Sequence, residues 1–120
     1  LMCKDVEVMI QFAAFYNFYA QFFLAIVIDL RSLIPLDKET ILNSVKRIGK
    51  VMMVHEDKVH SGFGAEVTSV IMEEAFEYLD GPVKRIGSTF TPVGFHRSFE
   101  RVILPNTEKI YNAAKDVLAY

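Results

Sequence analysis

Residues 8–28 contain no charged side chain, and this uncharged stretch limits how the chain can fold more than any other feature. Its 21 residues are enough to cross a bilayer as one helix. However, three amide side chains interrupt it, and residues 24–28 form an aliphatic and β-branched run that is typical of a buried strand. No basic segment precedes the stretch, as it would in a secretory signal. We therefore expect neither a membrane span nor a signal peptide.

Aromatic residues within this stretch recur at helical spacing. Phe12, Phe15, Tyr19 and Phe22 occupy positions i, i+3, i+7 and i+10, which place them on one face of a helix. Such a stripe packs in a core or an interface more often than it lines a cofactor site. The stretch is therefore expected to form a strand, a buried helix and a second strand of one α/β core.

The chain of 120 residues is expected to form one domain, because domains of about 100 to 150 residues commonly fold around a single core. Its 13 Lys and Arg residues against 15 Asp and Glu residues give a net charge of −2, which offers no general attraction for nucleic acid or anionic lipid. The single cysteine, Cys3, can form no disulfide within the chain, and this fits a reducing compartment.

After residue 28, helical patterns alternate with short apolar runs, as expected of a sheet covered by helices. Gly49 follows the first helical pattern at a position where a left-handed residue often ends a helix. The expected elements are a helix at 38–48, a strand at 51–54 that opens into a polar loop, a long helix from about 63 to 79, a strand at 83–86, a broken connection at 88–106 and a helix from Asn106.

Several groups that could carry chemistry are each better explained by structure. His55 and His60 are five residues apart on a strand and loop, whereas a zinc helix needs two histidines four apart. Gly62 and Gly64 open a helix and could receive an anion, but they lack the remaining residues of a phosphate loop. We therefore assign no catalytic, cofactor-binding or metal-binding residue. A stand-alone α/β domain that binds a nucleotide or another small molecule remains an alternative.

Five motifs occur in a recognisable order: IDLRSLIPLD at 28–37, VHED at 54–57, GFGAE at 62–66, TP at 91–92 and a final segment that begins ILPN at 103. In this order, from about Ile26 to Tyr120, the chain resembles the C-terminal domain of the beta subunit of thiamine-diphosphate-dependent 2-oxo-acid dehydrogenases, in the transketolase C-terminal superfamily. The resemblance implies an α/β fold of three layers, α/β/α, with a mixed, mostly parallel five-stranded sheet. Residues 1–25 are atypical for that family.

The resemblance also implies what the domain does. In this family the alpha subunit and the preceding domain of the beta subunit hold thiamine diphosphate and magnesium. The complete enzyme decarboxylates a 2-oxo acid oxidatively and transfers the acyl group to lipoyl. By resemblance, the present domain is not catalytic alone. It is expected to contact the alpha subunit and a second beta subunit, and to dock the subunit-binding domain of the lipoyl acyltransferase, in the mitochondrial matrix or in bacterial or archaeal cytoplasm.

The resemblance carries over to a few residues of this chain. The docking surface of the family uses the terminal carboxylate and nearby acids, which correspond here to Tyr120 and Asp80. A carboxylate paired with partner arginines orients the partner as well as attracting it. The residues expected at a subunit contact lie at the start of the long helix and are Gly62, Phe63, Gly64 and Glu66.

Overall fold

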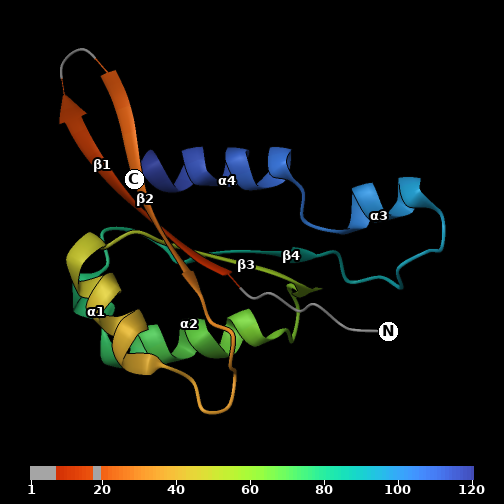
Figure 1. The fold of residues 1–120 in the computed structure, drawn as a ribbon, viewed down its shortest axis with the longest axis horizontal. Coiled ribbons are helices and arrows are strands. Elements are labelled where there is room, and N and C mark those ends of the chain that lie inside the picture. The colour runs from red at the N-terminus through yellow and green to blue at the C-terminus, as the bar shows by residue number, and fades with distance from the viewer. Residues whose placement is uncertain (1–7, 18–19) are drawn as a thin grey trace.

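The computed structural model describes the backbone of residues 8–17 and 20–120 and the side chains from Ala25 onward (Figure 1). The expectations for Cys3 and Tyr19 lie outside the described residues. The elements in chain order are β1 Val8–Asn17, β2 Ala20–Asp29, α1 Lys38–Ile48, β3 Val51–Lys58, α2 Phe63–Glu74, the 3₁₀ turn η1 Phe76–Tyr78, β4 Lys84–Ser88, α3 Arg97–Ile103 and α4 Thr107–Leu118.

The described strands form one mixed sheet in the order β2-β1-β3-β4. β1 pairs antiparallel with both β2 and β3, and only β3 and β4 are parallel, joined by the crossover helix α2. The expectation of a five-stranded, mostly parallel sheet is therefore wrong for the described residues, which form four strands with one parallel pair. The mixed character of the sheet is confirmed.

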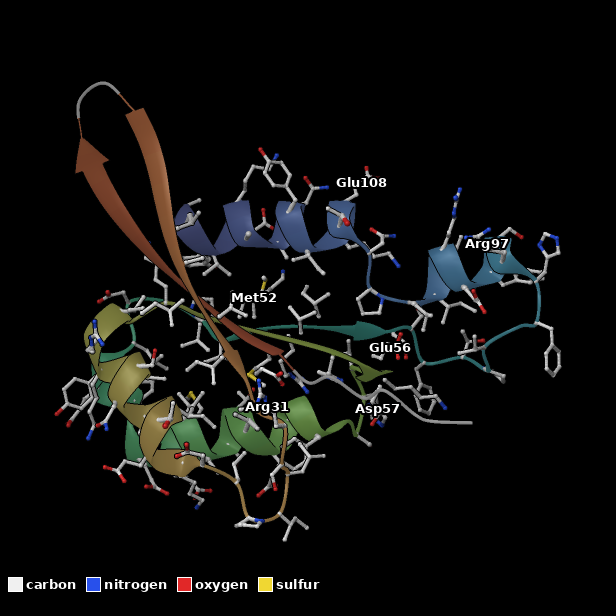
Figure 2. All side chains as sticks on the ribbon, in the orientation of Figure 1. Arg31, Met52, Glu56, Asp57, Arg97 and Glu108 are labelled. Carbon is white, nitrogen blue, oxygen red and sulfur yellow. The ribbon has the colours of Figure 1, made fainter. Side chains whose placement is uncertain are left out.

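Helices cover both faces of the sheet, which confirms the three-layer α/β/α arrangement (Figure 1). Successive side chains of a strand point to opposite faces, and β3 follows this rule. Val51 and Met53 pack with α1 and α2, whereas Met52 packs with α4 (Figure 2). All three side chains are at most 1% exposed, so β3 is the central strand of the core.

The N-terminal segment forms a hairpin instead of the expected strand, helix and strand. Phe12 and Phe15 lie in β1, and Phe15 is paired with Phe22 in β2. Because nearly every residue of the stretch is apolar, its pattern fits a helix and a strand equally well, and the aromatic residues favour the strand. Only the first half of β1 also pairs with β3, from Val8 to Gln11, so the hairpin extends beyond the sheet (Figure 1). No described helix has the length and apolar character that crossing a membrane requires.

The expected helix at 38–48 is confirmed, with its predicted ends. Asp37 caps its start, because its Oδ1 accepts from the Thr40 amide at 3.0 Å and its Oδ2 from the Thr40 hydroxyl at 2.7 Å. These bonds stabilise the carboxylate and lower the pKa of Asp37. Gly49 ends the helix with φ 73°, and its amide donates to the Val45 carbonyl at 2.8 Å.

Other boundaries differ from expectation, and β4 runs from Lys84 to Ser88 instead of 83–86. β3 continues through Lys58, because its polar end still pairs with β4 at Ser88. The long helix stops at Glu74, since Ala75 leaves helical geometry at φ −146° before η1 begins. The connection at 88–106 contains the short helix α3, which its surrounding prolines and glycines concealed. The final helix begins after the Asn106 cap, as predicted.

We predict that Gly49→Ala destabilises the domain by about 1–2 kcal/mol, because φ is positive there and a methyl group would meet the Asp80 carboxylate and the Tyr78 carbonyl. Thermal or urea unfolding of the purified chain measures the effect. Asn43→Ala, at an exposed position in the same helix, is the control and should leave stability within about 0.5 kcal/mol. Equal stability of Gly49→Ala and the parent would contradict the left-handed cap.

Candidate functional site

The last residue of the chain lies against the turn that follows η1. A Cβ placed on Gly81 would be 3.1 Å from the Tyr120 Cβ and 3.3 Å from its Cγ, so the tyrosine side chain rests directly on the glycine. Tyr120 nevertheless remains 73% exposed. Because Asp80 is the neighbour of Gly81, the structure brings together the two residues that the sequence predicts at a docking surface.

The backbone of Asp80 is bonded to Gly49, which lies just before the central strand β3. Its amide donates to the Gly49 carbonyl at 2.8 Å, and its carboxylate lies over the Gly49 Cα, where a Cβ would be 2.7 Å from the carboxyl carbon. The Asp80 side chain is exposed. The backbone of Asp80 is therefore anchored to Gly49, and its carboxylate lies close to this glycine while the side chain still faces solvent.

Lysine side chains secure the last turn of α4 beside this point. Lys50 Nζ donates to the Leu118 carbonyl at 3.3 Å, and Lys84 Nζ lies 4.0 Å from Asp116 Oδ2. The first contact satisfies a carbonyl that the end of the helix leaves free. We call the surface formed by Gly49, Lys50, Asp80, Gly81 and Tyr120 the C-terminal surface. Its exposed carboxylate beside an exposed aromatic ring can receive a cationic side chain from another molecule.

At the other end of β3, His55 is buried among glycines. The side chain is 1% exposed, and both ring nitrogens lack a hydrogen-bond partner within the described part of the chain. A Cβ would lie 2.6 Å from His55 Nε2 if built on Gly64, 2.7 Å from Cε1 if built on Gly62, and 3.0 Å from Cε1 if built on Gly87. The glycines therefore let the imidazole pack against the backbone of α2 and β4.

The environment of His55 favours its neutral form. Burial lowers the pKa of the imidazole, because the charged ring loses its hydration there, while Asp57 acts in the opposite direction and Arg85 in the same direction. His60 is exposed and packs edge-on against Phe90 at 4.9 Å. Among the described residues, no three His, Cys, Asp or Glu side chains gather in a way that could hold a metal ion.

The four residues predicted at a subunit contact lie around this histidine. Gly62 and Gly64 are buried against it, Phe63 is half-buried against the main core, and Glu66 is exposed. They lie at the start of α2, at the opposite end of the domain from Tyr120 (Figure 1). The packing of His55 accounts for both glycines, and a contact of this turn with another subunit stays a prediction. Sequence reasoning missed the link between His55 and Gly87, which are distant in the chain.

The comparisons with known proteins agree with this architecture. The model of the family "Transketolase, C-terminal domain" matches residues 6–110, and the chain belongs to this family. The chain is 43% identical over 91 residues to the pyruvate dehydrogenase E1 component subunit beta, mitochondrial, of Dictyostelium discoideum, a match that covers 76% of the chain and 26% of that protein.

Two further relatives carry the same description. The chain is 38% identical over 94 residues to the pyruvate dehydrogenase E1 component subunit beta of Rickettsia felis, covering 78% of the chain and 29% of that protein. It is 42% identical over 89 residues to the mitochondrial beta subunit of Pisum sativum, covering 74% of the chain and 25% of that protein. The chain thus spans little more than a quarter of the length of these relatives.

We predict that the domain loses stability as the pH falls below 6.5, the ordinary pKa of histidine. Below that value the unfolded chain binds a proton at His55 that the folded chain excludes, so the free energy of unfolding falls until the pH passes the lower pKa of the folded state. Urea unfolding between pH 8 and pH 5 measures the slope. The dependence of the free energy of unfolding on pH should become weaker in His55→Leu, whereas His60→Gln should behave like the parent. An unchanged pH dependence in His55→Leu would contradict the assignment of this effect to His55.

We also predict that Gly64→Ala destabilises the domain by about 1–3 kcal/mol, because the new methyl group overlaps the imidazole. In a His55→Ala background the same change should be much less harmful, since the overlapping ring is gone. A double-mutant cycle of unfolding free energies measures this coupling. Additive effects of the two substitutions would show that the glycine does not serve the histidine.

Proposed function

We propose that this chain is the C-terminal assembly and docking domain of a pyruvate-dehydrogenase-type E1 beta subunit. Its membership of the transketolase C-terminal family supports this, as does its identity of 38–43% to beta subunits over three quarters of its length. In the complete enzyme, thiamine diphosphate and magnesium serve the oxidative decarboxylation of a 2-oxo acid and acyl transfer to lipoyl. We propose that pyruvate is that acid.

This proposal assigns the chemistry to other parts of the assembly. The described residues offer no group of three metal-binding side chains for magnesium, and the buried nitrogens of His55 contact no solvent. We propose that the isolated domain is inactive, because in this family the alpha subunit and the preceding domain of the beta subunit hold the cofactor. Its partners are the alpha subunit, a second beta subunit and the lipoyl acyltransferase, in the mitochondrial matrix or in bacterial or archaeal cytoplasm.

The C-terminal surface is the single observation that carries the docking role. Tyr120 and Asp80 are 40 positions apart in the sequence, yet Tyr120 packs on Gly81, the residue that follows Asp80, and both side chains face solvent. An exposed carboxylate near an exposed aromatic ring suits arginine side chains, so we propose that the subunit-binding domain of the acyltransferase docks here through its cations.

We predict that Asp80→Asn weakens the binding of that subunit-binding domain about threefold to tenfold, because it removes a charge at an exposed contact without changing its shape. Deletion of Tyr120 should weaken binding further, because it removes the exposed aromatic ring next to the turn that carries Asp80. Calorimetry on the complete beta subunit assembled with alpha measures both.

Glu108→Gln is the matched control, since this acid lies in the same helix as the C-terminal segment but at its opposite end (Figure 2). It should bind like the parent protein. If Asp80→Asn, the Tyr120 deletion and the control all bind equally, the acyltransferase docks elsewhere and the proposal for this surface is wrong.

A further inference from the structure

His55 lies at an irregularity in the pairing of β3 with β4. The regular register ends at Val54 and resumes at Lys58. Between these points, residues 55–57 of β3 face the single residue Gly87 of β4, as in a β-bulge. The strand pairing that holds the rest of β3 to β4 is therefore interrupted at the buried imidazole.

The turn that covers the imidazole is weakly constrained. Ser61 has a left-handed backbone with φ 62°, a conformation that is unfavourable for a residue with a side chain. α2 then starts at Gly62 with no side-chain hydrogen bond at its cap, whereas Asp37 and Asn106 supply such a bond to α1 and α4. α2 therefore has a less secure start than either of these helices.

Hydrogen bonds limit how far this turn can open. Before it, the Val59 carbonyl accepts from Arg85 Nη1 at 3.0 Å. After it, the Thr68 hydroxyl donates to the Gly64 carbonyl at 2.7 Å. Residues 60–63 lie between these two attachments, so they can move while β4 and the body of α2 stay in place.

Movement of Gly62 would admit water to the ring. Its backbone lies against His55 Cε1, because a Cβ added to the glycine would be 2.7 Å from this atom. Cε1 is the carbon between the two ring nitrogens, and both nitrogens are buried without a hydrogen-bond partner within the described part of the chain. Displacement of this one glycine therefore exposes the edge of the imidazole that takes up a proton.

The charged groups around the ring do not supply the missing partner. The ionisable side chains on the surrounding elements are Glu56, Asp57 and Lys58 of β3, His60 of the turn, Glu66 of α2, and Lys84 and Arg85 of β4. Burial has the largest effect on the pKa of His55 and lowers it, while Asp57 acts against this and Arg85 with it. No described carboxylate bonds to the ring, so a protonated ring would carry two N–H donors with no acceptor. Such a group is much less costly when water reaches it.

We infer that His55 is a pH-sensitive latch, and that proton uptake by its imidazole opens the turn at residues 60–63 while the rest of the domain stays folded. The loss of global stability predicted above does not require this opening, because complete unfolding also exposes the ring. The turn contains Gly62 and Phe63, two of the residues expected at a subunit contact, so acid would loosen that surface first. The inference stands on the fold alone, and its failure leaves the proposed function unchanged.

Hydrogen exchange of the complete natural polypeptide at pH 8 and pH 5.5 tests the latch, with rates corrected for the pH dependence of the exchange chemistry. The Ala65 amide reports opening of the turn, because it donates to the Gly62 carbonyl at 3.0 Å. Amides of residues 51–53 in the central strand report global unfolding. The open population at Ala65 should rise about tenfold, as expected when one imidazole regains its ordinary pKa of 6.5 on opening. It should exceed the population reported by residues 51–53 and stay unchanged in dilute urea, which promotes only the larger unfolding.

Substitutions identify the group that titrates. His55→Leu should remove the rise at Ala65, and His55→Met serves the same purpose with a more flexible side chain if the leucine variant does not fold. His60→Gln is the matched control, because it removes the exposed histidine of the same turn, and it should open like the parent.

The inference is overturned if the open population at Ala65 does not rise in acid. It is also overturned if Ala65 exchanges no faster than residues 51–53, because the proton then enters only on global unfolding. A rise that persists in a folded His55 variant, or that disappears in His60→Gln, would assign the titration to another group and equally contradict the latch.

Discussion

The burial of β3 between two layers of helices is the constraint on which the rest of this structure depends. Val51 and Met53 join one helical layer to the sheet, and Met52 joins the other, with almost no exposure on either side. A strand that is apolar on both faces can exist only where both faces are covered. The crossover helix α2 and the final helix α4 are therefore required together, because the removal of either would expose the face of β3 that it covers.

This arrangement explains why the C-terminal surface and the buried His55 lie far apart. The eight residues of β3 span about 25 Å. The C-terminal surface is built around the residues that precede the strand, whereas His55 lies toward its other end, on the side where α3 projects (Figure 1). α4 joins the same two regions on the opposite face, since Asn106 and Lys109 support α3 while its last turn contacts Lys50. One core thus separates the C-terminal surface from the region around α3.

Sequence reasoning predicted the elements whose signals are local. The Asp37 cap, the left-handed Gly49 and the start of α4 at Asn106 follow from short-range chemistry, and all three are present. It failed for the uncharged N-terminal stretch, because the apolar residues there fit both the helical period and the strand period. Only pairing with β3 selects the strand. It could place Tyr120 near Asp80 only by family resemblance, because their contact through Gly81 depends on how the whole sheet is covered. The role of Gly87 beside His55 depends on the same tertiary packing.

Hydrogen exchange of the beta polypeptide, measured alone, with the alpha subunit and with the acyltransferase subunit-binding domain added, tests the assembly role most directly. The account predicts that residues 80–82 and 117–120 gain protection when the subunit-binding domain is added to the assembled alpha and beta subunits. Exchange in α1 should stay unchanged, because no partner is assigned to that helix. Protection confined to α1, or no change at the C-terminal surface, would contradict an assembly and docking domain built in this way.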